Sequence, residues 1–111
     1  MLIVDTDILI DAARKITEAV DYLERTETTM GLAISAVTQM ELLVGARDKQ
    51  SQQTVRHFLA RFTVIKLNAS IGDVAYDLLL KYRLSHGLAI ADALIAATVI
   101  VTAQPLATKN H

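Results

Sequence analysis

Three acidic residues stand beside apolar residues in segments that are far apart along the chain. Asp5 follows the apolar run 2–4, Glu41 lies between Met40 and Leu42, and Asp92 lies among isoleucine, leucine and alanine residues. A carboxylate in apolar surroundings is costly to bury unless it is paired or holds a metal ion. A fold that gathered these three acids would create a site for a hard cation, and such a site could support phosphodiester hydrolysis.

Each acid also has an ordinary structural interpretation. Asp5 can cap a helix that begins near Asp7, Glu41 has capping-box spacing from Thr38, and Asp92 can be a first-turn acid. However, Asp5 and Asp7 together bring two carboxylates to the end of one predicted strand. This excess of negative charge favours a cation over a simple helix cap, because a cap needs only one short polar residue.

The segments that would position these acids alternate between short apolar strands and longer helical patterns. Strands are predicted over residues 2–4, 32–34, 63–65 and 106–108. Helices are predicted from about residue 7, over 17–25, from Ser35 or Thr38 to near Gly45, over 51–62, from Asn68 or Ser70 to 82, and over 89–102. The alternation predicts an α/β fold, a three-layer α/β/α sandwich with a central parallel sheet. The functional crevice of such folds lies at the carboxyl ends of the strands, where Asp5 falls.

The composition is that of one globular domain, which we expect to be cytoplasmic. The 111 residues are 52% hydrophobic, enough to bury a single core, and the chain has no cysteine for a disulfide or a thiolate metal site. The apolar run 93–103 is too short to cross a bilayer, and the N-terminus lacks the features of a signal peptide. The net charge of −1 gives no sign of nucleic-acid binding, so contacts with RNA phosphates would need local arginines. The candidates for these contacts are Arg14, Arg47 and Arg83.

One interpretation of the acids is a haloacid-dehalogenase-like phosphatase. The segment Asp5-Thr6-Asp7 matches the nucleophile-x-acid pattern of that family, and the segment 72–77 resembles its later metal-binding motif. Asp73 and Asp77 fall at the start of a predicted helix rather than at a strand end, and Leu9 replaces a Thr or Val of the family. We therefore keep the phosphatase only as an alternative.

A second resemblance includes all three acidic segments. The segments VDTD (4–7), TQMELLVGA (38–46), IADALIAA (90–97) and LATKN (106–110) resemble the PIN-domain nucleases, and within them the VapC-type toxins of toxin–antitoxin pairs. The resemblance covers essentially the whole chain, and the order and spacing of the motifs are more specific than any one of them. It implies an α/β/α sandwich, a ribonuclease activity that depends on Mg²⁺ or Mn²⁺, a VapB-like antitoxin partner and a homodimer.

The resemblance also assigns roles to individual residues. Asp5, Glu41 and Asp92 match the three acidic metal-site positions and are the expected catalytic residues. Supporting positions are matched by Thr6, Asp7, Thr38, Thr108 and Asn110. The family commonly carries a fourth acid at or just after the last of these, and usually one more short strand. Either the fourth acid is missing or it lies in a tail beyond His111, so we expect one PIN-like domain over 1–111 without the family's C-terminal strand.

These observations together predict a metal-dependent endoribonuclease that cleaves single-stranded or structured RNA as the toxin of a pair. We expect the antitoxin in a groove near the helix of Glu41, with Met40, Leu43 and Val44 as contributors, although at least one of these three is expected in the core. A catalytically silent PIN-fold binding domain is the alternative from another class. The histidines are expected to be structural or surface residues, because Mg²⁺ prefers oxygen ligands.

Overall fold

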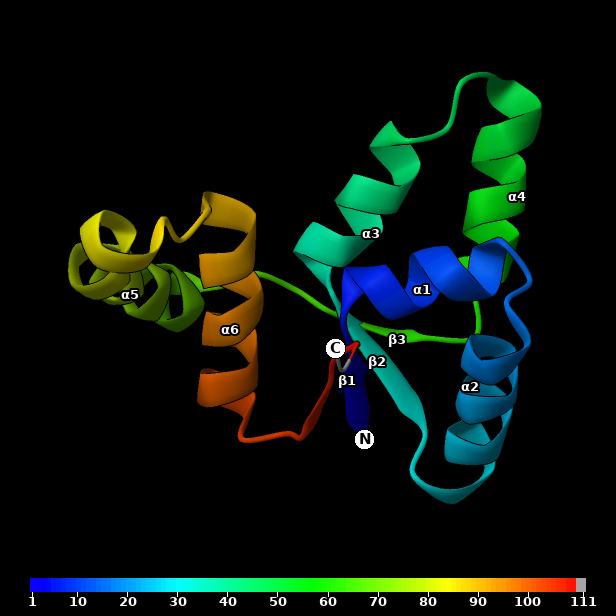
Figure 1. Cartoon of the computed structure of the whole chain (residues 1–111), viewed down its shortest axis with the longest axis horizontal. Helices are drawn as coiled ribbons and strands as arrows, with labels where there is room; N and C mark the ends of the chain where they lie inside the picture. The colour runs from blue at the N-terminus through cyan, green and yellow to red at the C-terminus, as the bar shows by residue number, and fades with distance from the viewer. Residues whose placement is uncertain (110–111) are drawn as a thin grey trace.

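A four-stranded parallel sheet forms the centre of the protein (Figure 1). The structure is a computed structural model that describes residues 1–109, so the predicted role of Asn110 lies outside the described residues. The strands are β1 (Leu2–Val4), β2 (Leu32–Ser35), β3 (Thr63–Ile65) and β4 (Leu106–Ala107). Their order across the sheet is β3-β2-β1-β4, and every pairing is parallel. β1 therefore lies between β2 and β4, with Val4 opposite Ala107.

Helices cover both faces of this sheet. They are α1 (Thr6–Ala13), α2 (Thr17–Thr29), α3 (Ala36–Val44), α4 (Lys49–Leu59), α5 (Ala69–His86) and α6 (Ile90–Thr102). Figure 1 shows α5 and α6 on one side of the sheet and α1, α2 and α4 on the other. The predicted three-layer α/β/α sandwich is confirmed. In the part of the chain that the structure describes, no helix is both long enough and apolar enough to span a membrane.

The core explains why the strands are continuous apolar runs. Leu2 and Val4 are buried in a cluster with side chains of α1, α2 and α4, and Ile3 between them is fully buried as well. Successive side chains of a strand point to opposite faces, so Ile3 faces the layer that contains α6. A strand buried on both faces loses the alternation of apolar and polar residues. A second cluster joins α5 and α6 through Ile71 and Ala97.

Short polar residues determine where the helices begin. The side chain of Ser35 caps α3 by accepting a hydrogen bond from the Val37 N–H at 3.0 Å, so Ser35 and not Thr38 is the cap. Asn68 caps α5 in the same way, and the predicted alternative start at Ser70 is wrong. Asp48 caps α4, so this helix spans Lys49–Leu59 rather than the predicted 51–62. Each cap satisfies a backbone N–H that would otherwise lack a partner.

The C-terminal end of α5 lies further along the chain than its apolar pattern predicts. The helix continues past residue 82 to His86 and stops where Gly87 adopts a left-handed conformation, with φ of 67°. The guanidinium of Arg83 donates to the carbonyl oxygens of Gly87 and Leu88, both at 3.1 Å. Arg83 therefore stabilises a helix end, and its expected role as an RNA contact loses support.

Candidate active site

Two of the three predicted acids, Asp5 and Glu41, lie near the edge where β1 and β2 end and α1 and α3 begin. Figure 1 shows these two helices starting close together at that edge, and α3 also contacts α6. Asp5 follows β1 directly, and its backbone N–H donates to the carbonyl oxygen of Ala107 in β4 at 3.0 Å. The carboxyl ends of three adjacent strands thus define this edge, as expected for a parallel α/β sheet.

Asp5 is both a helix cap and an acid in a negatively charged environment. It is the N-cap of α1, and its Oδ1 accepts a hydrogen bond from the Thr6 N–H at 2.8 Å. Burial raises the pKa of the Asp5 carboxyl above the ordinary value of 3.8, the Thr6 N–H lowers it, and the charges of Asp7 and Asp92 raise it again. Asp5 therefore does cap this helix, as its ordinary structural interpretation expects. The charges of Asp7 and Asp92 therefore disfavour the ionised form of Asp5.

Glu41 joins this edge through threonine hydroxyls. It is exposed on α3, and its Oε1 accepts a hydrogen bond from the Thr6 hydroxyl at 2.9 Å. The Thr6 hydroxyl is also 3.0 Å from the hydroxyl of Thr38, which is completely buried one turn earlier in α3. Thr6 therefore contacts Asp5 with its backbone N–H and Glu41 with its side chain. The predicted capping box between Thr38 and Glu41 does not form, because Ser35 is the cap.

Asp92 lies exposed in the first turn of α6. The N-cap of this helix is Ala89, which makes no side-chain cap hydrogen bond. Asp92 is thus a first-turn acid without a capping role, and its charge acts on Asp5 across the edge of the sheet. An acid in this position is favoured by the helix dipole and remains free to bind a cation.

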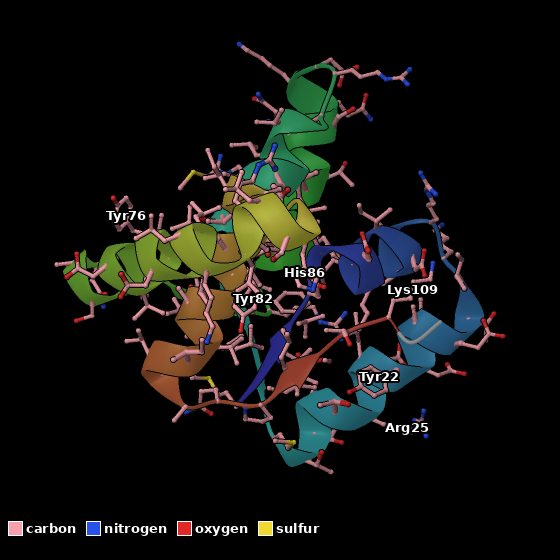
Figure 2. The ribbon with its side chains drawn as sticks, turned by 60° about the vertical axis from the view of Figure 1, so that its left-hand side comes forward. Tyr22, Arg25, Tyr76, Tyr82, His86 and Lys109 are labelled. Carbon is pink, nitrogen blue, oxygen red and sulfur yellow. The ribbon has the colours of Figure 1, made fainter. Side chains whose placement is uncertain are left out.

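The remaining predicted residues occupy different places. Asp7 is exposed in the first turn of α1. Thr108 comes one residue after β4, which ends at Ala107 rather than at 108, and the pairing of Val4 with Ala107 places Thr108 level with Asp5. Thr108 also lines a hollow beside α2 together with Tyr22 and Lys109, and Figure 2 labels these two residues on one side of the molecule.

A groove opens beside Glu41, between α1, α3 and α4. It has a volume of about 620 Å³, and its lining includes Arg14 and Glu41. A second groove between α3 and α4 is lined by Met40 and Leu43, whose exposed fractions are 52% and 38%, and Val44 nearby is 84% exposed. The expectation that at least one of these three apolar residues belongs to the core is wrong.

Both histidines in the described part of the chain are exposed. His57 is exposed on α4, and His86 is exposed at the end of α5, where its ring packs edge-on against Tyr82 with centroids 5.7 Å apart (Figure 2). The Nδ1 atom of His86 is 2.6 Å from the hydroxyl of Ser85. These contacts agree with the prediction that the histidines are surface or structural residues.

The oxygen donors at the acidic edge fit a hard cation that keeps part of its water shell. Within residues 1–109, no three His, Cys, Asp or Glu side chains lie close enough together to form a metal site by themselves. Mg²⁺ commonly binds through one or two carboxylates and retains several waters. A bound cation would relieve the repulsion that Asp7 and Asp92 exert on Asp5.

Comparison with known proteins identifies the family. The PIN domain model matches residues 2–111. The chain belongs to the PIN-domain family. It is 38% identical to "Ribonuclease VapC10" of Mycobacterium tuberculosis over 111 residues, which is 99% of this chain and 83% of that protein. It is 30% identical to "Ribonuclease VapC1" of Methanocaldococcus jannaschii, covering 98% of this chain and 75% of that protein.

Solved structures agree with this assignment. A chain of the "Toxin-antitoxin complex from Klebsiella pneumoniae" superposes on this PIN domain with a TM-score of 0.82 and 32% sequence identity. The superposition covers 99% of this chain and 87% of the other. The predicted PIN-like sandwich and the resemblance to VapC-type proteins are therefore confirmed.

Proposed function

We propose that this PIN domain is a metal-dependent endoribonuclease that acts as the toxin of a toxin–antitoxin pair. The observation that carries the proposal is the place of Asp5 at the carboxyl end of β1, where its neighbour Thr6 donates to Asp5 with its backbone N–H at 2.8 Å and to Glu41 with its hydroxyl at 2.9 Å. Its support from relatives is the identity of 38% to a VapC ribonuclease along nearly the whole chain. The proposed metal is Mg²⁺ or Mn²⁺, because carboxylates are hard oxygen ligands.

The side chains at the edge have distinct roles in this proposal. Asp5 and Asp92 hold the cation, and Glu41, oriented by Thr6, is the third acid of the metal site. When bound, the cation lowers the pKa of water and neutralises charge on the phosphate. The exposure of Glu41 and Asp92 leaves the edge open to a large substrate, as an RNA phosphodiester requires.

The partner that we propose is an antitoxin bound along α3. The groove between α3 and α4 presents Met40 and Leu43, and exposed apolar surface of this kind usually marks an interface. The similar solved structure from Klebsiella pneumoniae is a toxin–antitoxin complex. Leu43→Asp should abolish co-purification with the proposed antitoxin, whereas Thr54→Asp, at an exposed position on α4, should not. Equal binding by both variants would move the antitoxin to another face.

We also propose a homodimer. The outer face of α5 carries Tyr76, Leu80 and Leu84 at four-residue intervals, with exposed fractions of 63%, 67% and 100%. Figure 2 shows Tyr76 on the outside of the helix. Light scattering should give twice the monomer mass for the wild type and the monomer mass for Leu84→Glu. A monomeric wild type would contradict this part of the proposal.

An RNA cleavage assay with added antitoxin tests the proposed activity. The metal-supplemented protein should cut a mixed pool of RNA internally, and equimolar antitoxin should suppress the cutting. The phosphatase interpretation has little support from the structure, because Asp73 and Asp77 lie inside α5 rather than at a strand end. A covalent phosphate on Asp5 would restore it. The complete lack of cleavage would favour the silent binding domain.

A further inference from the structure

Thr38 is a buried polar residue with an unusual partner. Its exposed fraction is 0%, and it lies on α3 one turn before Glu41. In the described part of the chain its hydroxyl pairs with the Thr6 hydroxyl at 3.0 Å, across 32 positions of sequence. A buried threonine in a helix usually donates to the carbonyl four residues earlier, as Thr98 does to Leu94 at 2.8 Å. Thr38 instead directs its hydroxyl out of its own helix.

The chemistry of these groups fixes the direction of the hydrogen bonds. A hydroxyl has one hydrogen to donate, and an ionised carboxylate can only accept. The Thr6 hydroxyl gives its hydrogen to Glu41 Oε1 at 2.9 Å. Thr38 must therefore be the donor to Thr6. The chain of hydrogen bonds runs from the buried Thr38 through the half-buried Thr6 to the exposed Glu41.

We propose that Thr38 is a positioning residue, which fixes the Glu41 carboxylate toward Asp5 by orienting the Thr6 hydroxyl. This inference rests on the proposed function, in which these acids surround a cation. Thr6 also donates its backbone N–H to Asp5 at 2.8 Å, so this one residue contacts two of the three proposed acids. Thr38 touches no reacting group itself and acts only through Thr6.

Burial makes Thr38 suited to this role. Its branched side chain holds a restricted χ1 angle, and packing on all sides removes the remaining freedom. Hydrogen bonds in the poorly solvated interior are stronger than those in water, and donors in a chain reinforce one another. Glu41, by contrast, is exposed and would sample many conformations without a fixed donor. Thr38, at the buried end of this series of hydrogen bonds, thus supplies the rigidity that Glu41 lacks at the exposed end.

The test compares Thr38→Val with the matched control Thr98→Val. Both replace a fully buried helical threonine with a residue of the same shape, but the Thr98 hydroxyl serves only its own helix. Titration calorimetry with Mg²⁺ alone should show about a tenfold loss of affinity in Thr38→Val, within the range of about 10–100-fold typical of residues that support metal ligands. Thr98→Val should bind Mg²⁺ like the wild type.

A second measurement needs no metal. Three-bond NMR couplings report the χ1 rotamer of Thr6, which should be single in the wild type and in Thr98→Val and averaged in Thr38→Val. An unaltered Thr6 rotamer in Thr38→Val, or equal Mg²⁺ affinities of the two valine variants, would overturn the positioning role. A wild type that binds no Mg²⁺ would instead overturn the proposed function. If Thr38→Val does not fold, Thr6→Val can replace it, because this substitution removes the half-buried hydroxyl that links Thr38 to Glu41. Wild-type Mg²⁺ affinity in Thr6→Val would refute the inference.

Discussion

Replacing Asp92 with asparagine should distinguish a cation-binding acid from a structural one. Asp92 is exposed in the first turn of α6, and the N-cap of this helix makes no side-chain hydrogen bond. The charge of Asp92 raises the pKa of Asp5, so its removal relieves repulsion between like charges. In the opposite direction, the interaction of a first-turn acid with the helix dipole stabilises the fold by about 0.3–1 kcal/mol, and the asparagine variant loses this contribution.

These two effects oppose each other in the metal-free protein. The free energy of unfolding should therefore change by less than about 1 kcal/mol in Asp92→Asn. For a domain of this size, that change corresponds to a shift in Tm of less than about 8 °C. Mg²⁺ affinity should fall by more than about tenfold, because even residues that only support metal ligands usually cost that much.

Thermal unfolding in EDTA and titration calorimetry with Mg²⁺ measure the two quantities separately. Asp77→Asn is the matched control, because Asp77 is also an exposed helical acid but lies in the middle of α5. The control should change neither quantity. A loss of more than about 1 kcal/mol in EDTA, together with unchanged Mg²⁺ affinity, would mark Asp92 as a structural acid, since that is the typical cost of losing a helix cap.

Three further predictions concern stability. Asp5→Asn should stabilise the metal-free protein at pH 7, because the raised pKa of Asp5 means that its ionisation weakens the fold, and asparagine caps a helix as well as aspartate. In urea denaturation this advantage should vanish as the pH falls below 3.8, where Asp5 is protonated in both states; an advantage independent of pH would contradict the assignment. Mg²⁺ at ten times its Kd should raise the unfolding free energy of the wild type by about 1.4 kcal/mol, and no change in Tm would argue against binding. Asn68→Ala should cost about 1 kcal/mol by removing the cap of α5 without slowing RNA cleavage, and lost cleavage in the folded variant would contradict the separation of this cap from the site.

The sequence predicts most of the fold because strands and helix starts depend on local residues. The apolar run 2–4 is recognisable as a strand, since burial on both faces demands an unbroken apolar segment. Helix starts are less certain where two capping residues stand close together. Ser35 and Thr38 are both suitable caps, and only the three-dimensional path of the chain after β2 selects Ser35. The extension of α5 to His86 follows from Gly87, whose left-handed conformation marks the true end.

The candidate site was harder to predict because it depends on how distant segments meet. Asp5 is recognisable as a site candidate from its position after β1, although the excess of acid there favours a cation over the helix cap that the structure shows. The contact between Thr6 and Thr38 arises because β1 and β2 are adjacent in the sheet, so the helices that follow them start side by side. No local pattern encodes that adjacency. The sequence likewise does not predict that Met40, Leu43 and Val44 are all exposed, because an apolar residue looks the same in sequence whether it faces the core or a partner.

The most direct test of the account is the rate of RNA cleavage by metal-stripped protein as Mg²⁺ is titrated back. The wild type and the Asp77→Asn control should cleave at a rate that rises and saturates with Mg²⁺, whereas Asp5→Asn, retaining its helix cap, should lose most of this rate at every concentration. Cleavage by the wild type that is insensitive to Mg²⁺ and Mn²⁺, or full activity of folded Asp5→Asn, would contradict the account.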